Sequence, residues 1–296
     1  MLKNNIRGIG DKTFDAIVYI LAGLFALIAL YPLYLVVINS FSDPSAVAKG
    51  EVFIIPKGFS LDAYIEAFSN SQIMRGYANS LFYTVMGTAF SIALTIPAAY
   101  ALSKPYMVGR NFLMMMIVFT MYFSGGLIPH YLLIRGLNLM NTRTAVIVSA
   151  AISTSNLIVA RTFFASGVPR ELEEAAQIDG CSIPQTFFRI VLPLSKAMLG
   201  VLVLYYAVGR WNSYTTSLYY QPTAPELHSL QMVLKNMLMQ MQSQANQESE
   251  LAEYYANLFN QIKYSVIVIA SLPLMILYPF LQKYFDKGVM MGSVKG

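Results

Sequence analysis

The sequence is poor in the side chains that build metal sites and covalent cross-links. It holds one cysteine, Cys181, and two histidines, His130 and His228, which lie far apart along the chain. A single cysteine forms no internal disulfide, and isolated histidines do not supply the clustered ligands of a metal site. We therefore expect no metal ion and no catalytic residue in this chain.

Acidic residues are scarce where the chain is most apolar. Charged residues make up 12% of the sequence and hydrophobic ones 56%, a balance typical of integral membrane proteins. Apart from Asp15 at a boundary, no carboxylate falls within a predicted span. A membrane-embedded enzyme would need acid, base or metal ligands there, and a channel would need charged residues or a repeated filter. The composition therefore disfavours both alternatives.

The sequence also lacks a glycine-rich phosphate loop ending in Gly-Lys-Ser/Thr, so we expect neither a nucleotide site nor an enzyme activity of its own. The formal net charge of +5 does not indicate nucleic acid as a partner. Its basic residues are scattered near the ends of apolar stretches and form no aromatic-interleaved basic face. Their distribution indicates membrane topology instead.

Six apolar stretches are long enough to cross a bilayer as helices. The predicted spans are residues 15–38, 77–103, 111–133, 144–164, 197–214 and 261–284. The remaining segments are an N-terminus at 1–14, an external loop at 39–76, a five-span core at 77–285 and a C-terminal tail at 286–296. Basic residues are more numerous in the segments on the side of the two termini, which places both termini in the cytosol.

Two of these spans carry residues that break helices or favour close packing. The third contains Gly125, Gly126 and Pro129, which are tolerated at membrane depth where the backbone is buried in protein or lines a cavity. The fourth is rich in serine and alanine around Asn156, which favours packing against other helices over contact with lipid.

A charged segment at residues 168–193 separates the fourth and fifth spans. Three glutamates begin a short helix, where the helix dipole favours carboxylates, and Gly180 ends it. Ser182 and Gln185 have the spacing of a capping box and begin a second helix. The predicted faces carry Leu172, Ala175, Ala176 and Asp179 on the first helix, and Phe187, Ile190, Val191 and Leu194 on the second. The second helix is expected to run as one stiff element into the fifth span.

These residues resemble a known family. Glu174-Ala175-Ala176, then Gly180, then Ile190, Leu192 and Pro193 reproduce the spacing of the loop that defines permease subunits of ABC importers. The surrounding sequence resembles the carbohydrate-uptake, maltose-type branch of that family. The tail from Gly292 to Gly296 is similar to that of the second permease of a heterodimeric pair.

The resemblance implies an all-α, six-span membrane protein with the type I ABC importer permease fold and a cytosolic coupling hairpin. It implies a bacterial cytoplasmic-membrane complex with a different permease subunit, two cytosolic ATPase subunits that bind ATP and Mg²⁺, and an external solute-binding protein that delivers an oligosaccharide. The implied coupling residues are Glu174, Ala175, Ala176, Asp179, Gly180, Ile190, Leu192 and Pro193. In the tail, Ser293, Val294 and Lys295 are implied to contact the ATPases.

The substrate side is less well defined by the sequence. Aromatic and amide side chains that suit a sugar gather near the external end of the fifth span. These are Tyr205, Tyr206, Trp211, Asn212 and Tyr214, and two further candidates are Asn156 in the fourth span and His130 in the third. An interfacial aromatic belt would give the same pattern, and helix packing would explain the polar residues of the fourth span. A non-sugar solute such as a peptide or polyol remains an alternative.

Overall fold

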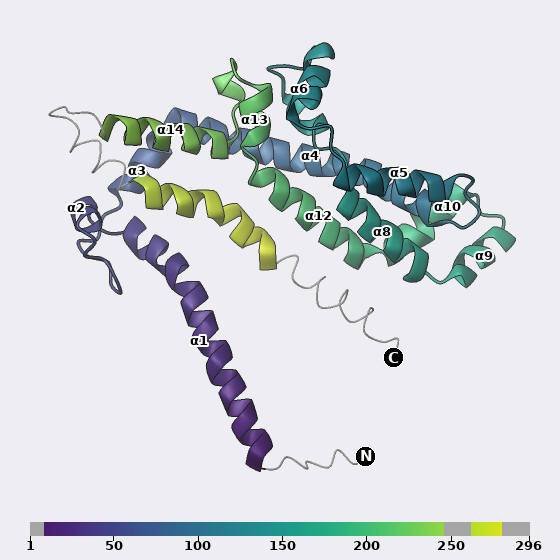
Figure 1. The fold of residues 1–296 in the computed structure, drawn as a ribbon, viewed down its shortest axis with the longest axis horizontal. Coiled ribbons are helices and arrows are strands. Elements are labelled where there is room, and N and C mark those ends of the chain that lie inside the picture. Colours follow the sequence, from purple (N-terminus) through teal and green to yellow (C-terminus); the bar gives the residue numbers. More distant parts are fainter. Residues whose placement is uncertain (1–8, 246–261, 280–296) are drawn as a thin grey trace. The chain divides into compact units, whose positions relative to one another are not determined.

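The computed structural model describes residues 9–245 and 262–279, and within them all regular structure is helical (Figure 1). The expected all-α fold is confirmed for this part of the chain. The chain divides into two compact units, one of residues 1–69 and 237–270 and the other of residues 70–236 and 271–296. The tail residues Ser293, Val294 and Lys295 lie outside the described residues.

Three helices are long and apolar enough to cross a membrane by themselves: Thr13–Ser40, Ser71–Ser103 and Ile262–Pro279. They overlap the first, second and sixth predicted spans, although the second helix begins at Ser71, within the predicted external loop 39–76, and the end of the predicted sixth span lies outside the described residues. Two bent pairs bring the possible number among the described residues to 5, if each pair is one span. These pairs are Arg110–Tyr122 with Leu127–Gly136, bent by 113°, and Ile183–Leu194 with Lys196–Trp211, bent by 81°.

The first unit holds α1 (Ile9–Ser40), α2 (Pro44–Ala48) and α3 (Asp62–Ser69). The carboxylate of Asp43 caps α2 by accepting from the backbone N–H of Ser45 at 2.9 Å. Hydrogen bonds from the side chain and backbone of Ser45 hold the pKa of Asp43 below its usual value. The end of α1 is fixed by Ser40, whose hydroxyl lies 2.7 Å from the Tyr64 hydroxyl and whose carbonyl accepts from Ser265 at 3.3 Å.

The second unit is organised around α4 (Ser71–Ser103). Its other helices are α5 (Arg110–Tyr122), α6 (Leu127–Gly136), α7 (Arg143–Val148), α8 (Thr154–Ser166), α9 (Arg170–Ile178), α10 (Ile183–Thr186), the π-helix η1 (Phe187–Val191), α11 (Leu192–Leu194), α12 (Lys196–Trp211), α13 (Thr215–Tyr220) and the 3₁₀ helix η2 (Pro225–Leu227). Helix α14 (Leu230–Ala245) begins in this unit and continues into the first unit from residue 237. Helix α4 packs along both α8 and α12. Its 33 residues correspond to about 50 Å, which exceeds the thickness of a bilayer's apolar core.

One apolar core joins the hairpin to the helices of the second unit. Its buried residues are Ile96, Ala99, Tyr100, Leu102, Leu157, Ala160, Phe164, Val168, Phe187, Val191, Met198 and Leu202. They come from α4, α8, the hairpin and α12, together with Val168 just before α9. The hairpin is therefore packed into the second unit and is not a loop that hangs free of it.

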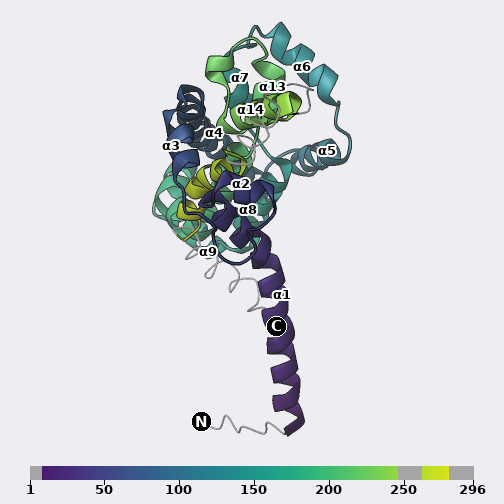
Figure 2. The same cartoon turned by 90° about the vertical axis from the view of Figure 1, so that its left-hand side faces the viewer.

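The third and fourth predicted spans are not straight helices. The third is broken between α5 and α6, where Gly126 adopts φ +84°, and α6 turns away from α5 (Figure 2). The break falls at the glycines Gly125 and Gly126 that the sequence marks as helix breakers. The fourth is interrupted at residues 149–153, between α7 and α8, so the expected continuous helix at 144–164 is wrong. The physical reason is a set of side chains from α12, described below.

Candidate functional site

The hairpin has the local structure that its sequence predicts. Helix α9 ends at a left-handed glycine, because Gly180 adopts φ +80°. Helix α10 begins at a capping box in which Gln185 accepts from the backbone N–H of Ser182 at 2.8 Å and from its hydroxyl at 3.0 Å. These two features reverse the chain within a few residues and fix the direction in which α9 points.

The faces of α9 differ in part from the prediction. Glu173 and Ala176 are buried, one turn apart on the side that meets the rest of the unit. The expected common face of Leu172, Ala175, Ala176 and Asp179 is therefore divided: Ala176 lies inward and the other three are exposed. Glu174, in the family motif, is exposed, and Ile178 is 87% exposed. Leu172, Ala175 and Ile178 thus form an outward apolar stripe, which we call the α9 stripe.

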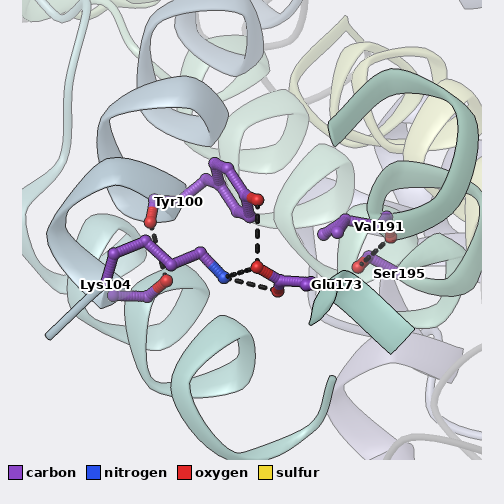
Figure 3. A network of polar contacts seen from close by, with 6 residues as sticks. Tyr100, Lys104, Glu173, Val191 and Ser195 are labelled. Carbon is purple, nitrogen blue, oxygen red and sulfur yellow. Dashed lines mark hydrogen bonds and ion pairs between the residues drawn. The ribbon is translucent and has the colours of Figure 1, made fainter. Parts of the chain in front are cut away.

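A buried ion pair fastens α9 to α4 (Figure 3). The ammonium group of Lys104, directly after α4, contacts both carboxylate oxygens of Glu173, with Nζ 2.6 Å from Oε2. The Tyr100 hydroxyl donates to the same Oε2 at 3.2 Å. The ammonium group also lies 4.2 Å from the centroid of the Tyr100 ring. Each carboxylate oxygen thus has a donor, which a buried anion requires.

This ion pair was not predicted, because its partners are 69 residues apart in sequence. Both side chains are only 10% exposed. Removing one partner of such a pair leaves an uncompensated buried charge, at a cost of about 3–5 kcal/mol. Nearby, burial raises the pKa of Tyr106, and the charge of Glu173 raises it further. The pair therefore positions α9 far more firmly than a surface contact would.

The second half of the hairpin is not the single stiff helix that the sequence predicted. It changes from α10 to the π-helix η1 and then to α11, before an 81° bend at Ser195 leads into α12. Pro193 has no N–H to donate to an earlier carbonyl, and the buried Ser195 hydroxyl donates to Val191 O at 2.7 Å (Figure 3). Both features favour a bend in a helix. The stripe on this half is also uneven, since Phe187 and Val191 are buried, Ile190 is partly buried and Leu194 is 54% exposed.

A cavity of about 380 Å³ lies among α4, α7, α8, α12 and α13. Its size falls within the range of small-molecule sites. Three of the predicted substrate residues line it: Asn156, Tyr205 and Tyr206. Ser153, from the serine-rich fourth span, lines it as well, and the polar lining residues that were not predicted are Tyr83, Arg210, Ser213, Thr216 and Ser229. The cavity is thus rich in hydroxyl groups and aromatic rings.

Two side chains of α12 explain the break between α7 and α8. Arg210 donates to three carbonyls at the end of α7 and just beyond it: Val146 at 3.3 Å, Ile147 at 3.0 Å and Ala150 at 2.8 Å. The Tyr206 hydroxyl accepts from the backbone N–H of Ser153 at 3.1 Å, just before α8. A break at this depth needs such partners, because lipid supplies none.

The other predicted substrate residues do not line this cavity. Trp211 is 2% exposed and packs edge-on against Tyr77. Tyr214 lies under the ammonium group of Lys235, 4.3 Å from the ring centroid, and Asn212 is exposed. His130, on α6, stacks 5.9 Å from the Tyr220 ring. Among the described residues no cluster of His, Cys, Asp and Glu could hold a metal ion.

Helix α4 connects the cavity with the ion pair. Tyr83 lines the cavity, and Tyr100 bonds to Glu173. At 1.5 Å per residue these positions are about 26 Å apart along the helix axis. One helix, with Pro97 inside it, therefore contacts both the ion pair and the wall of the cavity.

Comparisons with known proteins agree with this architecture. Residues 73–291 match the family described as "Binding-protein-dependent transport system inner membrane component". Protein LplC of Bacillus subtilis (strain 168) is 41% identical, over 96% of this chain and 96% of LplC. The polygalacturonan/rhamnogalacturonan transport system permease protein YtcP of the same organism is 39% identical, over 97% of this chain and 99% of YtcP.

A solved structure extends the likeness to three dimensions. One chain of a bacterial ABC transporter involved in the import of the acidic polysaccharide alginate superposes with a TM-score of 0.85 and 33% identity. The match covers 95% of this chain and 100% of that one. The protein accordingly belongs to the family of binding-protein-dependent transport system inner membrane components, the permeases of bacterial ABC importers.

Proposed function

We propose that this chain is the permease subunit of an ATP-driven importer that takes up an oligosaccharide delivered by an external solute-binding protein. The names of similar permeases support a carbohydrate, since they include transport proteins for polygalacturonan/rhamnogalacturonan and for arabinooligosaccharides. The observation that carries the proposal is the continuous path from the exposed face of α9, through the ion pair and α4, to a cavity lined by hydroxyls and aromatic rings.

The partners are inferred from the apolar surface that α9 exposes. Its α9 stripe is an exposed apolar surface of the kind that a protein partner covers. We assign that surface to one of two cytosolic ATPase subunits, which bind ATP and Mg²⁺, with Glu174, Ala175 and Gly180 at the contact. A second, different permease completes the membrane part. The hairpin, both termini and the tail residues Ser293, Val294 and Lys295 face the cytosol in this arrangement.

The mechanism is alternating access that is driven by the ATPase subunits. Closure of the ATPase dimer on ATP draws α9 inward. The Lys104–Glu173 pair and the core around Phe187 and Val191 carry that movement to α4, α8 and α12. These three helices supply six of the thirteen residues that line the cavity, so its shape changes with the nucleotide state. Hydrolysis of ATP then resets the arrangement.

Uptake by the reconstituted complex tests this function. Proteoliposomes with this chain, its partner permease and the ATPases should accumulate a labelled oligosaccharide only when the binding protein and ATP are both supplied. Replacing the binding protein's sugar with a peptide or polyol should give no accumulation. Uptake without ATP, or uptake of a non-sugar solute alone, would overturn the proposal.

A further inference from the structure

Arg210 places a positive charge on the wall of the cavity, and within the described part of the chain no carboxylate pairs with it. All of its acceptors are neutral: the three carbonyls around the end of α7, and the hydroxyl of Ser91, 2.9 Å from Nη2. Its Nε is buried and has no acceptor among the described residues. A guanidinium group does not lose its proton in a protein, so the charge is permanent.

The lining of the cavity contains no acidic residue. Residues 67–170 and 180–225 supply every lining residue of the cavity except Ser229, and they contain no Asp or Glu. The ion pairs recorded in the described part of the chain do not involve Arg210. The carbonyl end of α7 offsets at most about half a charge. The cavity wall therefore carries a net positive charge.

A glycine on α4 leaves space for the Arg210 side chain. A Cβ atom added to Gly87 on α4 would lie 2.6 Å from Cδ of Arg210, so a larger residue there would displace the Arg210 side chain. The guanidinium is thus held between α4 and the end of α7, on the cavity that Tyr206 and Asn156 also line. A charge held in this way is pre-organised for an anion, whereas a neutral ligand would leave it uncompensated.

We propose that the cavity receives a carboxylate-bearing sugar, so that the transported oligosaccharide belongs to the uronate-containing class. Arg210 supplies the attraction for the carboxylate, while the tyrosine rings and hydroxyl groups of the lining accept the sugar ring. This inference rests on the proposed function and narrows its substrate. It also makes Arg210 a specificity-determining residue in addition to its contacts with the α7 carbonyls.

Equilibrium binding to the assembled complex tests the inference without the selectivity of the binding protein. The complex is arrested with ATP by an ATPase variant that cannot hydrolyse it. The probes are a labelled trisaccharide of galacturonic acid and its neutral methyl ester. The wild-type complex should bind the acid about ten- to a hundredfold more tightly than the ester, the range expected for one charged hydrogen-bonded contact. Equal binding of acid and ester by the wild-type complex would overturn the inference.

Two variants separate recognition from structure. Arg210→Gln should weaken binding of the acid to the level of the ester and leave the ester unchanged, whereas Arg210→Lys should keep part of the preference. If Arg210→Gln fails to assemble, the comparison of acid binding with ester binding by the wild-type complex still tests the inference. Unchanged acid binding in Arg210→Gln would contradict the inference. A wild-type complex that takes up a neutral oligosaccharide and binds no acid would retain the proposed function and reject only this assignment.

Discussion

Replacing Gly180 with proline is expected to reduce uptake and binding-protein-stimulated ATP hydrolysis to background, while membrane insertion stays intact. Gly180 adopts φ +80°, and the proline ring holds φ near −65°. Proline would also remove the N–H that donates to Gln177 O at 3.0 Å. The turn after α9 would then open, and α9 would lose its orientation. Uptake and hydrolysis are measured in proteoliposomes, and insertion by membrane fractionation.

The matched control is Gly180→Asn. Asparagine tolerates the left-handed conformation, and a Cβ atom at this position meets nothing within 4 Å. This variant should keep most of the wild-type transport. Wild-type transport by Gly180→Pro would show that the turn is not needed for coupling, and an equal loss in both variants would show that its conformation is not what matters.

Exchanging the charges of Glu173 and Lys104 in one double variant is expected to restore the uptake that each single charge reversal removes. Glu173→Lys leaves two cations in a buried site, and Lys104→Glu leaves two carboxylates there, at a cost of about 3–5 kcal/mol each. Each single variant should lower uptake at least about tenfold, because a loss of 1.4 kcal/mol already corresponds to a factor of ten. The double variant rebuilds a pair of opposite charges and should recover a large part of the activity.

Glu171→Lys is the control for this series, because it makes the same charge change in the same turn of α9 at an exposed position. Exposed charges near a helix start contribute only about 0.3–1 kcal/mol. Uptake should therefore fall by less than about fivefold. Wild-type uptake by Glu173→Lys, or a double variant no better than the singles, would contradict a coupling role for the ion pair.

The parts of the hairpin that depend on neighbouring residues were predictable from the sequence. The left-handed glycine and the capping box each involve residues within one helical turn, so residue type and spacing suffice to place Gly180, Ser182 and Gln185. The long helices α1 and α4 were largely predictable for a similar reason, since most of each is one apolar stretch, but the start of α4 at Ser71 falls within the predicted external loop. The resemblance of the motif to a known family then indicated that the hairpin contacts an ATPase subunit.

The contacts that connect the hairpin with the cavity were not predictable. The Lys104–Glu173 pair joins residues far apart in sequence, and both read locally as exposed charges at the end of a helix. The interruption at residues 149–153 depends on Arg210 and Tyr206 of another helix, which replace the backbone hydrogen bonds. Arg210 did carry one local signal, because it is a lone charge within an apolar helix, and such residues usually have a partner or a function.

Cysteine crosslinking at position 175 tests the central claim, that the exposed face of α9 meets the ATPase. In a Cys181→Ser background, Ala175→Cys places a thiol on the exposed side of α9. In the assembled, transport-competent complex we predict a crosslink from this thiol to the ATPase subunit, with a yield that changes when ATP is added. Leu137→Cys, exposed after α6 in the segment between the third and fourth predicted spans, which the predicted topology places outside the cell, should give none. A complex that transports without any crosslink at position 175, or with an equal crosslink at position 137, would contradict the account.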